Sequence, residues 1–237
     1  MALPKLNTLT YELTLPSTGK ELKFRPFLVK EQKALMIAQE SEDDKQIENA
    51  FAQIINDCTF GELDAYTIPM FDVEYVFLRI RSKSVGEISK LKLLCPDDKK
   101  TYADVEVNLE DVQVQVGDEH TNKIDLGDGK GVIMTYPTID SFMSGDYLSV
   151  TAENMLDIIV SCIEQIYDKG GEEVHMAVDS TKKELTEFIE QLNTEQFKKV
   201  QKFFDTMPKL KHTVTVKNPE TKVESEVILT GLNDFFE

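Results

Sequence analysis

Three segments of the sequence alternate apolar and polar residues on both sides of a short turn. They are TYELTLPSTGKELKFRPF near the start, KLKLLCPDDKKTYADVEVNL in the middle and HTVTVKNPETKVESEVIL near the end. Because side chains alternate between the two faces of a strand, this pattern predicts a β-hairpin with one apolar face. VQVQV, KIDL and VIMTY add three shorter strand candidates, and the turn GDGKG joins the last two. Any fold of this chain must therefore accommodate hairpins in three separate places.

A first group of helices is predicted between the first and second hairpins. Apolar residues at helical spacing run from Leu28, stop at the acidic run ESEDDK, and resume through Cys58. We therefore expect two helices around a solvated acidic break. A third helix is expected in TIPMFDVEYVFLRIRSK, with Thr67 as its N-cap and Pro69 in its first turn.

A second group of helices follows the central strands. The apolar residues of TAENMLDIIVSCIEQIYDKGG predict one helix that is buried on more than one side and ends at Gly170 and Gly171. Thr181 and Glu184 form a candidate capping box at the start of the next helix, STKKELTEFIEQL. A last helix is predicted in NTEQFKKVQKFFDTMP and ends at Pro208.

This order of elements indicates an α+β fold, with β-hairpins at the N-terminus, middle and C-terminus packed with two groups of amphipathic helices. A chain of 237 residues can form one large or two small domains. We expect a single α+β protein over residues 1–237. The pattern leaves open a division into two lobes, residues 1–140 with the first hairpin, helices and central β section, and residues 141–237 with the second helical group and the last hairpin.

The charge of the chain limits its partners. Forty-three acidic residues against 26 basic residues give a formal net charge of −17. A field of this sign repels phosphate backbones and anionic membranes, so no nucleic acid and no membrane partner is expected. A basic or neutral protein surface is favoured instead. The sequence also has no apolar run long enough for a membrane span and no signal peptide, so the chain is expected to stay in a cytoplasm.

The cysteines do not form a metal-binding pattern. Cys58, Cys95 and Cys162 are widely spaced among apolar neighbours and are expected to be reduced, packed thiols. The Cys-Pro turn at Cys95 has the form of a zinc knuckle, but Asp98 stands where the second cysteine of the pair would be. We therefore expect the hairpins to hold together without metal.

The histidines and the glycine-rich turn carry no catalytic pattern either. None of His120, His175 and His212 lies at helical spacing from another histidine or a cysteine, as a zinc site would require. DLGDGKG lacks the ligand order of a calcium loop and the glycine spacing of a phosphate loop, so a hairpin turn is the simpler interpretation. No catalytic residue, metal or cofactor is expected, and the chain is predicted not to be an enzyme.

The end of the chain, LTGLNDFFE, places Phe235 and Phe236 side by side in an otherwise very acidic protein. Two interpretations remain open. In the first, the two rings and Leu232 bind a partner. In the second, the rings fold back and cap the core of their own protein.

The stretches FRPFLVKEQKALMIAQES, MTYPTIDSF and LTGLNDFFE resemble the baseplate hub subunit or hub-assembly family of T-even-type contractile-tailed bacteriophages, in an order and spacing that extend over essentially the whole chain. The resemblance implies a non-enzymatic protein of the tail baseplate hub. Its partners would be other hub or tape-measure proteins in a hetero-oligomeric assembly, formed in the host cell cytoplasm and found in the virion tail baseplate. The same stretches make Arg25, Phe27, Tyr136 and Pro137 further candidates for partner contacts.

Two alternatives remain beside the structural role. One is a transient tail assembly chaperone that is absent from the mature virion. The other is a small hydrolase acting on the host cell wall, which would require a convergent acid pair or a metal in a cleft. Asp125, Asp128 and His175 are the residues whose substitution would test the hydrolase.

Overall fold

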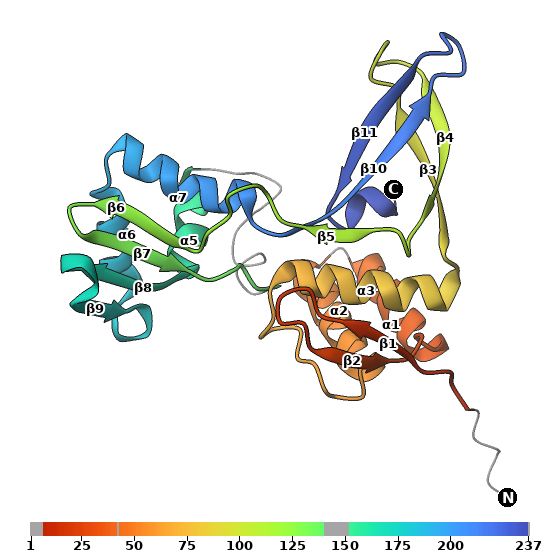
Figure 1. The fold of residues 1–237 in the computed structure, drawn as a ribbon. Helices are drawn as coiled ribbons and strands as arrows, with labels where there is room; N and C mark the ends of the chain where they lie inside the picture. Colours follow the sequence, from red (N-terminus) through yellow and green to blue (C-terminus); the bar gives the residue numbers. More distant parts are fainter. Residues whose placement is uncertain (1–6, 42, 140–151, 237) are drawn as a thin grey trace, which may run out of the picture. The chain divides into compact units, whose positions relative to one another are not determined.

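The structure is a computed structural model that describes residues 7–41, 43–139 and 152–236 (Figure 1). The chain divides into two compact units. Unit 1 contains Met1–Gln115 and Lys209–Glu237, and unit 2 contains Val116–Pro208, so unit 2 is inserted between two parts of unit 1. No helix within the described ranges is long and apolar enough to cross a membrane.

Strand pairing explains where the units divide. The strand β5 (Gln113–Gln115) precedes the insertion, and β10 (Lys209–Lys217) follows it. These strands pair antiparallel, with Leu210 opposite Val114, so the chain leaves and re-enters unit 1 at the same place. The division into two lobes between residues 140 and 141, considered from the sequence, lies outside the described residues and stays a prediction.

The N-terminal part of unit 1 contains a hairpin and three helices. These elements are β1 (Tyr11–Thr14), β2 (Glu21–Phe24), α1 (Val29–Ser41), α2 (Asp44–Cys58) and α3 (Met70–Val85). The predicted hairpin is confirmed, with Leu13 opposite Leu22. The acidic break between the first two helices supplies an N-cap, because the Asp43 side chain accepts hydrogen bonds from the N–H groups of Lys45 and Gln46.

Helix α3 is buried around most of its circumference. Phe71, Val76 and Ile80 are all buried although they point in different directions around the helix. The predicted N-cap Thr67 is wrong, because α3 begins one residue after Pro69, which makes no side-chain cap. The Thr67 hydroxyl instead donates to the Asp64 carbonyl oxygen at 2.9 Å, in the turn before the helix.

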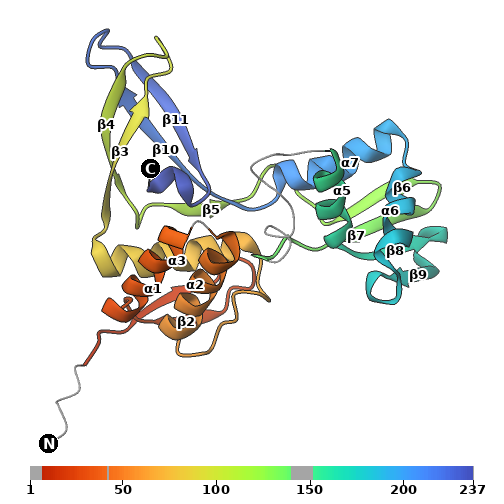
Figure 2. The same cartoon turned by 180° about the vertical axis from the view of Figure 1, so that it is seen from behind.

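The C-terminal part of unit 1 is built from two hairpins. Its remaining strands are β3 (Ile88–Leu94), β4 (Tyr102–Asn108) and β11 (Glu224–Thr230). β3 pairs with β4, while β11, β10 and β5 form a three-stranded antiparallel sheet in that order. Figures 1 and 2 show the β3–β4 and β10–β11 hairpins lying against each other. Their inward side chains share one core, which includes Leu91, Val107, Val214 and Leu229.

Unit 2 has a four-stranded antiparallel sheet in the order β6-β7-β8-β9. Its elements are β6 (Lys123–Gly127), β7 (Lys130–Met134), α5 (Ala152–Ser161), β8 (Ile163–Asp168), β9 (Glu173–Met176), α6 (Lys182–Glu190) and α7 (Thr194–Thr206). Apolar residues of the sheet and the three helices form one core, with Val132, Ile159, Ile189 and Phe203 among its buried members. With unit 1, this arrangement confirms the predicted α+β fold.

One predicted helix of unit 2 is wrong in its second half. The helix expected to run to Gly170 ends at Ser161, and β8 begins two residues later. Apolar residues at helical spacing do not by themselves exclude a strand, and here β8 is held in the sheet by pairing with β7 at one edge and with β9 at the other. The glycines end this strand instead of a helix: Gly170 has a φ of +72°, in the turn that leads to β9.

The last two helices of unit 2 follow the sequence pattern closely. The Thr181 side chain accepts from the N–H of Glu184, and the Glu184 side chain accepts from the N–H of Thr181, so the predicted capping box is confirmed. Asn193 and Gln196 form a second capping box at the start of α7. The helix ends before Pro208, as predicted.

Candidate partner-binding site

The two C-terminal aromatic residues lie in different environments. Phe235 is fully buried in the core shared by the two hairpins of unit 1, and its carbonyl oxygen accepts a hydrogen bond from Ser89 Oγ at 2.7 Å. Phe236 is 37% exposed, and the guanidinium of Arg81 lies 5.4 Å from its ring centroid. The core-cap interpretation therefore describes Phe235, whereas a partner contact of Phe236 stays a prediction.

Leu232 is part of the same C-terminal turn and is partly buried against the unit 1 core. Its N–H donates to Glu74 Oε1 on α3 at 3.1 Å. Burial raises the pKa of the Glu74 carboxyl, and the hydrogen bond from Leu232 offsets this only in part. Gly231, at a φ of +73°, turns the chain out of β11 toward this contact. Leu232 thus anchors the turn that carries Phe235.

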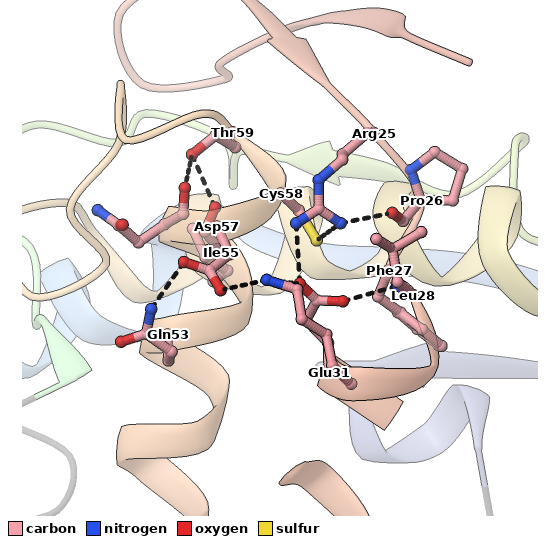
Figure 3. Close-up of polar contacts among 12 residues, drawn as sticks. Arg25, Pro26, Phe27, Leu28, Glu31, Gln53, Ile55, Asp57, Cys58 and Thr59 are labelled. Carbon is pink, nitrogen blue, oxygen red and sulfur yellow. Dashed lines mark hydrogen bonds and ion pairs between the residues drawn. The ribbon is translucent and has the colours of Figure 1, made fainter. Parts of the chain in front are cut away.

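Arg25 fixes the start of α1 through an ion pair (Figure 3). Its Nη2 lies 2.8 Å from Glu31 Oε1, and the Glu31 side chain is only 3% exposed. Glu31 Oε2 accepts from the N–H of Leu28 at 2.7 Å, which satisfies a free N–H at the helix start. Burial alone would raise the pKa of the Glu31 carboxyl, but hydrogen bonds from Arg25, Leu28 and Lys30 hold it below its ordinary value.

The same network ties α1 to the end of α2. The N–H of Arg25 donates to the Cys58 carbonyl oxygen at 2.9 Å, and Arg25 Nη1 lies 3.7 Å from Cys58 Sγ (Figure 3). Burial raises the pKa of the Cys58 thiol to about 11, so this thiol stays protonated near neutral pH. Lys30 Nζ lies 3.5 Å from Asp57 Oδ2.

Phe27 is half-buried, and its N–H donates to Ser84 Oγ on α3 at 2.9 Å. Arg25 and Phe27 therefore position α1 within unit 1.

The outer side of α1 carries exposed apolar side chains. Val29, Met36 and Ile37 are 80%, 54% and 53% exposed, and we call these three residues the α1 surface. Val29 and Met36 lie seven residues apart, on the side of the helix opposite to the buried Glu31 and Ala38. An exposed apolar group of this kind on an ordered helix is typical of a protein-binding surface.

The sequence pattern pointed to only part of this surface. Val29, Met36 and Ile37 all lie in the stretch FRPFLVKEQKALMIAQES that carried the resemblance, but Met36 and Ile37 were not singled out as candidates for partner contacts. The available signal was that apolar residues occur around the whole circumference of α1, since Leu35 and Ala38 face inward while Met36 and Ile37 face outward. A helix with apolar residues on all sides is expected to be in contact with other protein surfaces on both its inner and its outer side.

Tyr136 and Pro137 lie inside unit 2. Pro137 is buried, and the Tyr136 hydroxyl lies 3.0 Å from His120 Nε2. His120 Nδ1 lies 3.0 Å from Thr206 Oγ1, and the Tyr136 ring stacks on the buried Phe203 ring with centroids 5.6 Å apart. Burial lowers the pKa of His120, so the neutral ring is favoured. These contacts give Tyr136 a packing role within unit 2, and contact of Tyr136 or Pro137 with a partner stays a prediction.

The three histidines lie on or beside different strands. His120 precedes β6, whereas His175 lies on β9 and His212 on β10. Across the described ranges, no group of three histidine, cysteine, aspartate or glutamate side chains is arranged as metal ligands. In DLGDGKG, Asp128 and Gly129 have φ values of 54° and 75°, so this stretch is the tight β6–β7 hairpin turn.

The hairpin tips of unit 1 are held by hydrogen bonds. Cys95 is a buried free thiol, as predicted. Asp98, in the place of a second cysteine, accepts from the hydroxyl and N–H of Thr101, and these bonds lower its pKa. The neighbouring Asp97 accepts from Asn218 Nδ2 at 3.0 Å, which joins the β3–β4 tip to the β10–β11 tip.

A comparison with protein families identifies the chain. The family model described as "T4 bacteriophage base plate protein" matches residues 8–237, which include both units. The chain therefore belongs to this family, and the resemblance to T-even-type baseplate proteins is confirmed at that level. The comparisons with curated proteins and with solved structures find no match.

Proposed function

We propose that this baseplate protein is a non-enzymatic structural or assembly component of the baseplate hub that acts by protein–protein binding. The observation that supports the proposal is the family match over residues 8–237, which extends over both units. Its partners are other hub or tape-measure proteins, which it meets in the host cell cytoplasm during assembly and in the virion tail baseplate afterwards.

The α1 surface supports this binding role. Arg25 and Glu31 hold α1 in place from its buried side, so Val29, Met36 and Ile37 are presented without any rearrangement of the helix. A preformed apolar surface binds with a smaller loss of conformational entropy than a surface that must first become ordered. The net charge of −17 keeps copies of the protein apart and favours a basic or neutral partner.

The test is affinity purification of the full chain from infected cells, followed by identification of the co-purifying tail proteins. Hub or tape-measure proteins are expected with the wild type and should be lost in a double variant of the α1 surface, Met36→Ser and Ile37→Ser. Val178→Ser, which changes an exposed apolar residue of unit 2, is the matched control and should retain the partners. Recovery of no tail protein with the wild type would refute the proposal.

The transient chaperone remains the second candidate, since exposed apolar side chains on α1 suit either role. Quantitative mass spectrometry of purified particles separates the two. A structural component is expected at a fixed stoichiometry relative to the other baseplate proteins, whereas a chaperone should be missing or present in trace amounts.

A further inference from the structure

The strand β11 is at the edge of its sheet. Within the described residues, β11 pairs with β10 on one side and with no strand on the other. In an antiparallel pair only every second residue directs its N–H and C=O at the partner strand. Gly231 N–H donates to the Leu210 carbonyl at 3.0 Å, and Asn218 N–H donates to the Val223 carbonyl at 2.9 Å. These bonds show that the odd-numbered residues of β11 face β10.

The even-numbered residues of β11 therefore direct their backbone groups away from the sheet. At one end this edge is closed, because the N–H of Thr230 donates to Asp234 Oδ2 at 2.7 Å. Glu226 and Ile228 have no such partner in the described part of the chain, and the strand there has neither a proline nor a bulge. A proline and a bulge are two of the features that protect an edge, and charged side chains are a third. Glu224 and Glu226 on the exposed face of β11 disfavour a like-charged strand, but they leave the backbone of Glu226 and Ile228 open to pairing with a basic one.

The side chains of the same residues determine which strand fits. Glu224, Glu226 and Ile228 all lie on the exposed face of β11, and Ile228 is 63% exposed. Glu224 is paired with Lys217 Nζ at 3.0 Å, whereas Glu226 has no ion pair among the described residues. A strand added at this edge would place a side chain directly opposite each of them.

We propose that β11 binds an extended segment of another tail protein by adding it as a fourth strand to the β11-β10-β5 sheet. The segment carries a lysine or arginine opposite Glu226 and an apolar residue opposite Ile228, so these two residues are separated by one residue in the segment. Main-chain hydrogen bonds supply affinity, and the two side-chain contacts supply selection. The inference rests on the proposed binding role and names the chemistry of one partner.

The net charge of the chain disfavours a second copy of this protein as the strand that pairs with β11. Two copies each carry a net charge of −17 and repel one another. The β3 strand of a second copy does offer Lys90 and Lys92 on an exposed face, so self-association has to be measured and not assumed absent.

The experiment uses the full chain and two synthetic peptides, Thr-Thr-Val-Thr-Lys-Thr-Lys and the same peptide with glutamate in place of lysine. Amide hydrogen exchange and chemical shifts are followed by NMR. The lysine peptide is expected to protect the amides of Glu226 and Ile228 and to leave Val227, which already faces β10, unchanged. Glu226→Gln should weaken binding of the lysine peptide by about two- to fivefold, the range of one cross-strand ion pair.

The N–H that Ile228→Pro removes points away from β10, so binding should be lost while the pairing of β11 with β10 is kept. Ile228→Thr is the matched control, because it changes the side chain but keeps the N–H. If Ile228→Pro does not fold, the Glu226→Gln comparison still decides the question. Equal binding of both peptides, protection outside β11, or dimers in sedimentation that disappear in Ile228→Pro would overturn the inference. If hub proteins still co-purify after such a result, the proposed function stands without this site.

Discussion

Replacement of Phe235 by alanine should unfold unit 1 much more easily than the same replacement of its neighbour Phe236. Phe235 is fully buried between two hairpins, so Phe235→Ala removes a whole ring from the core and leaves a cavity, at a cost of about 3–5 kcal/mol. Phe236 is 37% exposed, and loss of its partial burial and its contact with Arg81 should cost about 1–2 kcal/mol.

These free energies are separable in a urea titration. With a slope of about 2 kcal/mol per molar urea, Phe235→Ala should lower the unfolding midpoint of unit 1 by about 2 M, and Phe236→Ala by less than about 1 M. Pulsed hydrogen exchange with mass spectrometry assigns the transition to each unit. Peptides from α7 in unit 2 serve as the internal control, because their midpoint should not change.

Truncation after Gly231 completes the comparison. It removes the Phe235 ring together with the hydrogen bond from Leu232 to Glu74, so it should destabilise unit 1 at least as much as Phe235→Ala. The reasoning would be refuted if the truncated chain kept the wild-type midpoint for unit 1 and failed only to assemble with tail proteins. That result would make the C-terminal turn a docking element and not a core cap.

Three further predictions concern buried or partly buried ionisable groups. Arg25→Met leaves the buried Glu31 without its closest cation and should destabilise unit 1 by about 3 kcal/mol in urea unfolding, whereas Lys30→Ala, at an exposed side chain, should cost less than about 1 kcal/mol. The raised pKa of Glu74 means that the folded state binds its proton more tightly than the unfolded state. The contribution of Glu74 to the free energy of unfolding is therefore present at acidic pH and is lost as the pH rises through the pKa of Glu74 in the folded state. Glu74→Gln should remove this pH dependence in unfolding titrations across the same pH range. The lowered pKa of His120 has the opposite sign, so unit 2 should lose stability as pH falls below about 6.5 toward the folded pKa, and His120→Gln should lose this dependence; an unchanged pH profile would refute the assignment.

The sequence pattern was sufficient to predict elements whose stabilising contacts join residues close together in the chain. The N-terminal hairpin and the capping box of α6 follow directly from alternation and from the spacing of Thr181 and Glu184. The strand β8 was missed because its pairing with β7 and β9 decides its conformation. The spacing of apolar residues in the sequence does not show which strands pair. The pairing of β5 with β10 joins residues that are distant in the chain, so the insertion of unit 2 could not be predicted.

The candidate site was predictable only in part for a related reason. Phe235 and Phe236 are chemically identical, and their different environments follow from the turn at Gly231 and the contact of Leu232 with Glu74. Arg25 and Phe27 were chosen from a resemblance that cannot separate residues contacting a partner from residues that position them. The structure gives both an internal hydrogen-bonding role.

The α1 surface and the edge of β11, the two proposed binding elements, both differ from what is usual for a surface helix and an edge strand. A surface helix ordinarily pairs one apolar stripe with a polar outer face, yet α1 exposes Val29 and Met36 opposite its buried side. An edge strand is ordinarily closed by a proline, a bulge or a covering segment, yet β11 leaves the backbone of Glu226 and Ile228 open and has only acidic side chains to protect it there. Such departures expose a protein to self-association, and a net charge of −17 opposes self-association while leaving a basic partner free to bind. The acidity of the chain is therefore best understood as the condition that allows these surfaces to remain uncovered until a partner arrives.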